Sequence, residues 1–279
     1  MPGFCRLKPS LHLNLTLVTQ HLLRGNLTLE LIKSIPVDDN PGFAMTSALW
    51  LPVQAYYAIH GFGMACLAAK DGPGNLPQTH GGFIRKAESS LVRHLLPLPF
   101  GAVLRNGYKG FKYLQPELVN LPDDRRFIGS GLNLERPKTE TRDAHIAQCL
   151  DTTRRRLIVE KLNRERAKAR KPGKRNGVLK EPAQIKIARS LWPTTVLDYL
   201  YRVRVKSNYE DPTMYRDGTD DAETVIELVR NTQTLATTLC ALFAVILWQI
   251  IDDSTRDEFC TSYRIDGLIR NLDSPYVVG

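Results

Sequence analysis

The chain has 279 residues, of which 43% are hydrophobic and 24% are charged. This composition allows a sizeable buried core and excludes a globally disordered chain. The formal net charge of +9 favours polyanions as partners and says nothing about the fold.

The charge excess is concentrated in one segment. Between residues 138 and 180, fourteen Lys or Arg side chains oppose five Asp or Glu, a net charge of +9 that equals the excess of the whole chain. One region is therefore expected to attract anions, while the rest of the molecule is close to neutral. The five cysteines have no paired spacing, which argues against a disulfide framework or a zinc site and favours a reducing cytoplasm. We predict neither a metal nor a cofactor.

Residues 1–45 contain short apolar runs. The alternation in LHLNLTLV favours a strand, whereas the spacing of its leucines also allows a helix. We interpret 1–45 as a mixed N-terminal segment that can pack on the domain that follows, with Pro36, Pro41 and Gly42 marking a loop.

Two helices are predicted next, at about 46–69 and 80–96. Thr46 or Ser47 can cap the first, and Pro52 is expected to kink it or to reset its start. Gly61 and Gly63 form a GxG inside this helix, but no acidic ribose partner follows, so a dinucleotide site is not indicated.

The middle of the chain, residues 97–181, is predicted to be an insertion. Its first part is rich in Pro and Gly and favours a loop with a hairpin or a short helix. Residues 141–170 predict a basic helix that ends at KPGKRNG. Helical spacing then returns, and Pro193 is expected to start a fresh helix at about 194–205.

The last long helix is predicted at about 221–251. Its segment 235–251 has no charge over 17 residues, so it is either a buried central helix or a short membrane span. The upstream residues keep apolar helical spacing with charges on the other face, which favours the buried helix. The predicted fold is mainly α: an up-and-down helical bundle built from 46–96 and 182–270, with a long basic insertion.

The order of these features resembles the HEPN domain family. AYYAIHGFGMACLAA followed by THGGFIRKAE is similar to the family's aromatic-rich first helix and Thr-His-x-Gly turn, and LDYLYRVRVKSNYEDPTMY is similar to its Arg-rich helix end. The similarity covers about 120 residues and leaves the insertion outside. It implies a protein of prokaryotic type that is associated with RNA or nucleotides, and a homodimer in which two polar helix ends share a cleft.

Active HEPN ribonucleases have an Arg, then a His four to six residues later, often with a Tyr two further on. Arg202 matches this Arg, Ser207 stands at the His position and Tyr209 at the Tyr position. No His follows Arg202, and Ser207 lacks a pKa near neutrality for proton transfer. Arg202, Arg204 and Lys206 can still hold a phosphate. The alternative is a solvated helix C-terminus at which cations offset the helix dipole.

Two histidines are candidates to replace the missing imidazole. His60 lies among apolar residues of the first predicted helix, and His80 lies at the Gly-Gly turn. Either side chain can approach Arg202 across a bundle. The alternative, which we favour on the sequence alone, is a hydrogen-bonded core or turn histidine without a catalytic role.

The basic insertion is the candidate nucleic-acid-binding element, since its charge is dense and of a single sign. The alternative is a solvated loop that only raises solubility. The cations of the predicted basic helix are Arg154, Arg155, Arg156, Lys161, Arg164, Arg166, Lys168, Arg170 and Lys171.

Two functions follow from these observations. The first is a metal-independent endoribonuclease acting as a toxin or in antiviral defence, or a relative that binds RNA without cleaving it; the missing His argues against cleavage. The second is a nucleic-acid-clamping subunit of a larger nucleoprotein or effector assembly, including the non-catalytic partner of a nucleotidyltransferase in a toxin–antitoxin pair. Both place the protein in the cytoplasm, with RNA or another nucleic acid as the partner and no membrane.

Overall fold

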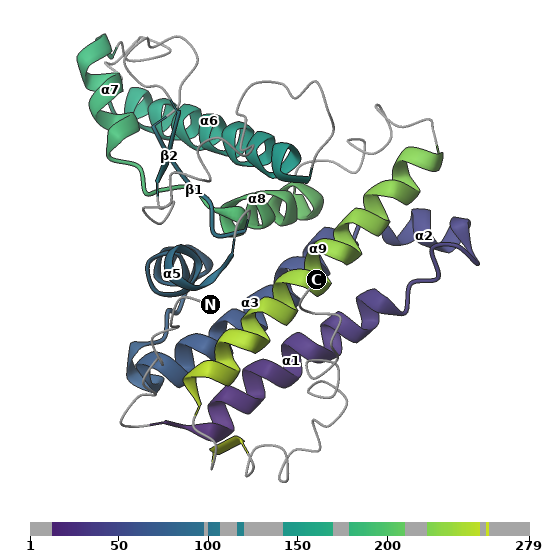
Figure 1. Cartoon of the computed structure of the whole chain (residues 1–279). Helices are drawn as coiled ribbons and strands as arrows, with labels where there is room; N and C mark the ends of the chain where they lie inside the picture. Colours follow the sequence, from purple (N-terminus) through teal and green to yellow (C-terminus); the bar gives the residue numbers. More distant parts are fainter. Residues whose placement is uncertain are drawn as a thin grey trace. The chain divides into compact units, whose positions relative to one another are not determined.

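A computed structural model describes residues 13–97, 100–106, 116–119, 142–169, 179–209, 222–251 and 255–256. Helices account for 80% of the interpretable residues, so the prediction of a mainly helical protein is confirmed (Figure 1). The elements in chain order are α1 (Leu15–Lys33), α2 (Pro41–Ser47), α3 (Leu51–Asp71), η1 (Pro73–Asn75), α4 (His80–Ala87), η2 (Glu88–Val92), α5 (Arg93–Leu95), β1 (Val103–Asn106), β2 (Pro116–Val119), α6 (Arg142–Lys168), α7 (Glu181–Arg189), α8 (Val196–Tyr209) and α9 (Ala222–Ile250).

The chain divides into two compact units. The first comprises Met1–Ala87 and Val203–Gly279, and the second comprises Glu88–Arg202. These boundaries group α1 with the predicted helical bundle, whereas 88–96 and 182–202 belong with the insertion. One boundary falls inside α8, so the two halves of that helix belong to different units.

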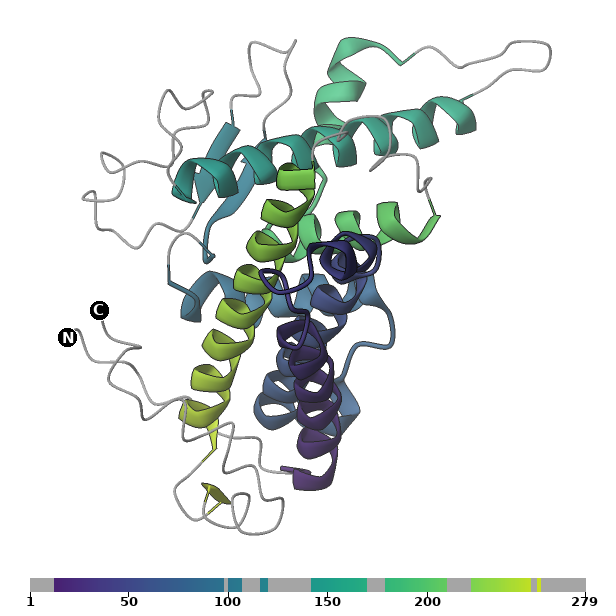
Figure 2. The same cartoon turned by 90° about the vertical axis from the view of Figure 1, so that its right-hand side faces the viewer.

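In the first unit, α3 is the central helix. Sixteen of its 21 residues are buried, as expected for a helix that is apolar on all sides. Both views show α1 and α9 running alongside α3 (Figures 1 and 2). The core of this unit therefore lies along α3, between its two long neighbours.

Two glycines set how closely α3 approaches its neighbours. A Cβ atom added to Gly61 would lie 2.7 Å from the Cα of Gly25 in α1, a distance that real side chains essentially never reach. A Cβ added to Gly63 would lie 2.8 Å from the ring of Phe83. The GxG of α3 therefore serves packing, which the sequence did not reveal.

In the N-terminal segment, where the sequence allowed a strand or a helix, the structure has a helix. Residues 15–33 form α1, whose first turn is capped by the Asn14 side chain accepting a hydrogen bond from the Leu17 amide. The strand alternative is wrong there, because the leucines follow a helical period. The loop expected at Pro41 is instead the start of α2, since proline suits the first turn of a helix.

Proline also resets the start of α3. The helix begins at Leu51 with Pro52 in its first turn, and neither Thr46 nor Ser47 caps it. Their hydroxyls instead donate to backbone carbonyls four residues earlier. The sequence predicted that Pro52 would either kink the helix or reset its start, and the structure shows that it resets the start.

The second unit is built on α6 and α7. Ile158 and Leu162 of α6 pack with Ala188 of α7 in a small core, so the predicted basic helix is confirmed as a folded part of this unit. The predicted hairpin is also present, with β1 and β2 paired antiparallel. Residues 142–168 are helical, and the described part of α6 buries Ile158 and Leu162, so the alternative of a loop is wrong there.

A capping arrangement starts α8 after Pro193. The Thr195 amide donates to the Asp198 carboxylate at 2.8 Å. This is one half of a capping box, in which an acidic side chain in the first turn accepts a hydrogen bond from the amide three residues before it. The predicted fresh helix is confirmed, and it extends to Tyr209.

The long helix α9 packs one side on α3. Residues on that side include Leu239, Cys240 and Phe243, and all three are fully buried. By length and composition alone, Val225–Ile250 could also cross a membrane, and 44% of its most apolar stretch is buried in the fold. The buried side fits the prediction of a core helix, while the absence of a membrane and the cytoplasmic location stay predictions.

Candidate functional site

The candidate site is a cluster of aromatic and basic side chains in the first unit. Tyr56 and His60 lie four residues apart on α3, which places them on one side of that helix. Their rings are 5.8 Å apart, and the His60 ring lies 4.5 Å from the buried Phe83 ring of α4. This packing orients the His60 imidazole.

His80 joins the cluster through the turn before α4. The Thr79 side chain accepts a hydrogen bond from the Gly82 amide, which starts the helix at His80. His80 Nδ1 and the Tyr56 hydroxyl share a hydrogen bond of 2.9 Å, and the His80 and His60 rings are 5.2 Å apart. The Thr-His-Gly-Gly turn therefore places a second imidazole beside the first.

Arg204 of α8 completes the cluster. Its guanidinium donates to the Tyr57 hydroxyl at 2.8 Å, and its central carbon lies 5.0 Å from the Tyr57 ring centre and 5.4 Å from that of Tyr56. Both contacts have the geometry of cation–π pairs. Arg204 is only 8% exposed, whereas Tyr57 is 41% exposed, so Tyr57 is the more accessible of the two side chains.

The cluster favours the uncharged form of both imidazoles. Burial first, and then the charges of His80, His21 and Arg204, lower the pKa of His60 to about 4. Burial also lowers the pKa of His80, again with help from the charge of Arg204. A neutral imidazole can accept a proton, so the lowered pKa values favour potential bases over imidazolium acids in this cluster.

The structure brings Arg204, rather than Arg202, to the aromatic cluster. The two residues are separated by about 200° around α8, so they project from opposite sides of it. Arg202 donates to the Thr153 hydroxyl of the second unit at 3.3 Å. Ser207 is half-buried, and the side chains of Lys206 and Tyr209 lie outside the described residues.

The predicted cations of α6 divide into three groups. Arg154 is 1% exposed and donates to the backbone carbonyls of Trp192 and Ala188, so its selection as a nucleic-acid contact was wrong: its charge serves the end of α7. Arg164 is exposed and Arg166 half-buried. Four others form ion pairs along the helix, namely Arg155–Asp151, Arg156–Glu160, Lys161–Glu165 and Lys168–Glu165.

Arg170 and Lys171 lie outside the described residues. The described cations of α6 that can meet a polyanion are consequently fewer than the sequence suggested. They are Arg155, Arg156, Lys161, Arg164, Arg166 and Lys168.

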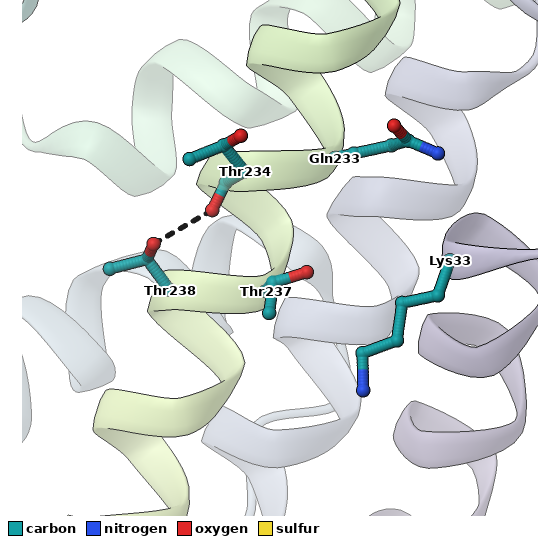
Figure 3. A pocket seen from close by; sticks show the side chains of 5 residues that line it. All are labelled: Lys33, Gln233, Thr234, Thr237 and Thr238. Carbon is teal, nitrogen blue, oxygen red and sulfur yellow. Dashed lines mark hydrogen bonds between the residues drawn. The ribbon is translucent and has the colours of Figure 1, made fainter. Parts of the chain in front are cut away.

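A separate open hollow of about 330 Å³ lies between α1 and α9. Figure 3 shows Lys33 of α1 near Thr237, with Gln233, Thr234 and Thr238 completing the lining. Gln233 donates to the Ile32 carbonyl at 2.9 Å and thereby ties α9 to the end of α1. Within the ranges that the structure describes, no group of three His, Cys, Asp or Glu residues is placed to hold a metal ion.

Comparisons of the chain with protein-family models, curated proteins and solved structures gave no match. The cluster therefore has to be interpreted from its own chemistry. Sequence reasoning selected His60, His80 and Arg204 but missed the two tyrosines that connect them. The signal was the spacing in AYYAIH, which places Tyr56 and His60 one helical turn apart.

Proposed function

We propose that this protein is an RNA-associated helical protein of the HEPN kind, in which the Arg204 cluster contacts the sugar-phosphate backbone or a terminal nucleotide. The observation that carries the proposal is the convergence of Arg204, Tyr57 and His80. A guanidinium beside an exposed phenol suits a phosphate oxygen, and an exposed aromatic ring suits an unpaired base.

Arg204 acts through Tyr57 in this proposal. A guanidinium that donates to the phenol oxygen leaves the phenol hydrogen free to point outward and polarises that O–H. Tyr57 and the partly exposed His80 would then meet the nucleic acid, and Arg204 would hold them in place. Arg204 is accordingly a positioning residue with a long-range attraction for anions.

The same chemistry supports binding more than cleavage. Metal-free RNA cleavage needs a base for the 2′-hydroxyl and an acid for the leaving 5′-oxygen. The lowered pKa values of His60 and His80 favour the neutral imidazole, which can act as the base, over the imidazolium form, which would act as the acid. We therefore propose an RNA-binding relative whose cleavage at neutral pH is slow or absent.

The test is binding and cleavage of labelled single-stranded RNA in the presence of a chelator. We expect Tyr57→Phe, His80→Gln and Arg204→Lys each to weaken binding about tenfold, which corresponds to about 1.4 kcal/mol. Arg230→Lys is the matched control, because Arg230 is an exposed arginine of α9 that pairs with Asp38. Arg202→Lys makes the same substitution at the other arginine of α8, so it tests whether the loss of binding is specific to Arg204.

Equal binding by wild type and all three cluster variants would overturn the proposal, as would a wild type that binds no RNA at low salt. Cleavage that survives in chelator and disappears in His80→Gln would instead establish the ribonuclease.

A second candidate function is a nucleic-acid clamp within a larger assembly. It is favoured by the exposed cations Arg164 and Lys168 near the end of α6. Deleting 138–180 would remove the core residues Ile158 and Leu162, so point substitutions are the better test. Arg164→Glu with Lys168→Glu should then abolish binding that the cluster variants leave intact, and Lys186→Glu on the exposed side of α7 is the control.

A further inference from the structure

Trp192 is a half-exposed tryptophan of the second unit that buried charged residues hold in place. It is 50% exposed, and because most of the surface of a tryptophan is ring, the ring itself reaches solvent. Its indole N–H donates to the Glu88 carboxylate at 2.8 Å, and its backbone carbonyl accepts a hydrogen bond from Arg154. Glu88 and Arg154 are each only 1% exposed. Two buried charges are therefore used to fix a residue that does not itself fill the core.

The backbone next to Trp192 is fixed as well. Thr194, two residues later, exchanges two hydrogen bonds with Leu104 of β1, at 2.9 and 2.8 Å. On the other side, the chain leaves α7 through its C-cap residue Ser190. A ring whose N–H and backbone are both tied has little conformational freedom left to lose when a ligand stacks on it. The exposed part of the Trp192 ring is therefore preorganised for contact.

A π turn positions the carboxylate that holds the ring. Glu88–Val92 forms η2, a π-helix, whose hydrogen bonds join residues five apart. Glu88 and Arg93 are five apart, and on an α-helix their side chains would point about 140° away from each other. The wider π turn brings them to one side, where the Arg93 guanidinium pairs with one Glu88 oxygen at 2.7 Å while the other oxygen accepts from Trp192. The charge of the carboxylate is thereby neutralised beside the ring.

The net charge of the second unit indicates the kind of ligand. Between residues 88 and 202 the sequence has twenty-four Lys or Arg and twelve Asp or Glu, a net charge of +12. The rest of the chain has fourteen against seventeen, a net charge of −3. A polyanion is therefore attracted to the unit that carries Trp192. Among polyanions, single-stranded nucleic acids also present planar rings that stack on an exposed aromatic side chain.

We propose that Trp192 is a stacking platform for an unpaired base of a single-stranded nucleic acid, with Glu88 as its positioning residue. The base stacks on the exposed part of the indole ring. Arg93, whose side chain is 23% exposed, adds a positive charge beside the ring. The platform belongs to the second unit and shares no residue with the Arg204 cluster, so variants of the two sites test them separately.

Binding of labelled oligouridylate and oligodeoxythymidylate of equal length to the full chain tests the contact. We expect Trp192→Leu to weaken the binding of both about tenfold, and Trp192→Phe, which keeps an aromatic face, to weaken it about threefold. Trp50→Leu is the matched control, because Trp50 is 62% exposed in the first unit and should leave binding unchanged. Circular dichroism verifies that each variant is folded. Tighter binding of one of the two oligonucleotides identifies RNA or DNA as the source of the base.

An abasic oligonucleotide separates stacking from charge, because it keeps the phosphates and lacks the bases. Wild type should bind it about tenfold more weakly than oligodeoxythymidylate. Trp192→Leu should bind the two within about threefold of each other, since the stack is already lost in this variant. The loss caused by Trp192→Leu should also be the same factor at low and at high salt, because a stacking base releases no counterion.

The fluorescence of Trp192 tests the role of Glu88. In the double variant Trp50→Phe with Trp248→Phe, Trp192 is the sole tryptophan of the chain. We expect oligodeoxythymidylate to quench its emission. Glu88→Ala in this background should lower the emission anisotropy, because the ring becomes mobile, and should weaken binding about threefold. Glu88→Gln keeps an oxygen that can accept from the indole N–H and should restore both.

Three results would overturn the proposal. Trp192→Leu could bind both oligonucleotides as tightly as wild type, the oligonucleotide could leave the Trp192 emission unchanged, or wild type could bind the abasic oligonucleotide as tightly as the normal one. In each case Trp192 would only pack the second unit together. Binding lost in Trp192→Leu and kept in Tyr57→Phe would support the platform and count against the Arg204 cluster, and the reverse pattern would do the opposite.

Discussion

Each unit of this protein holds a buried arginine in its described part, and the two arginines have different surroundings. In the second unit, Arg154 donates to two backbone carbonyls near the end of α7, and the acidic side chains Glu88 and Asp198 lie in the same unit. In the first unit, Arg204 contacts a phenol hydroxyl and two aromatic faces beside the imidazoles of His60 and His80. The first arginine completes the fold, whereas the second supports side chains that reach the surface.

Burial of a charge alone therefore does not mark a functional site. What distinguishes the two is the kind of partner: backbone carbonyls fix Arg154 to the scaffold, while Tyr57 connects Arg204 to solvent. Of the two arginines, only Arg204 is part of the proposed RNA contact.

The largest effect is expected from the two arginines themselves. Arg154→Met leaves the carbonyls of Trp192 and Ala188 without their charged donor, so the free energy of unfolding should fall by about 3 to 5 kcal/mol. Arg204→Met should lower it by about 1 to 2 kcal/mol, because the methionine still packs on the tyrosine rings, but should lose RNA binding. Urea denaturation and the binding assay together separate the two. If Arg154→Met were as stable as wild type but lost RNA affinity, Arg154 would serve binding and not the fold, which is the opposite of the expected result.

The two units should also respond to acid in opposite ways. Burial raises the pKa of Asp198 to about 6 in the folded state, so the folded protein takes up a proton there before the unfolded chain does. Stability from this group is full below pH 4 and lost as the pH rises through 6. The difference amounts to about 3 kcal/mol at most. Asp198→Asn, which keeps the acceptor for the Thr195 amide, should therefore gain stability relative to wild type as the pH rises from 4 to 7.

His60 should give the reverse slope. Its pKa of about 4 lies below that of an unfolded histidine, so the unfolded chain takes up the proton first. Stability from His60 is full above pH 6.5 and falls by about 2 kcal/mol as the pH drops toward 4. His60→Gln should gain relative to wild type on acidification. Denaturation curves at pH 4, 5.5 and 7 measure both slopes, with the exposed-site variant Asp39→Asn as control, and slopes of the same sign would refute the assignment.

Sequence reasoning located helices well and the site only in part. Apolar spacing predicted α9, whose buried side repeats with the helical period, while the uninterrupted basic stretch before KPGKRNG predicted α6. It selected Arg202 as the motif arginine, whereas the structure brings Arg204 to the cluster, because that choice depends on how α8 is rotated about its axis. It also could not recognise Arg154 as buried, since a run of three arginines looks uniformly solvated until the position of α7 is known.

The smallest effect should come from the surface of α6. Glu165 pairs with Lys161 at 3.6 Å and with Lys168 at 2.9 Å, so it neutralises part of the charge that could meet a polyanion. Glu165→Gln should leave the melting temperature unchanged, because ion pairs between exposed side chains contribute little to stability. If α6 contacts nucleic acid, the variant should bind RNA about two- to threefold more tightly at low salt and lose affinity more steeply as salt rises. Glu227→Gln on the exposed side of α9 makes the same change of charge in the other unit. An equal gain from both variants would mean that net charge alone attracts RNA and that α6 is only a solvated helix.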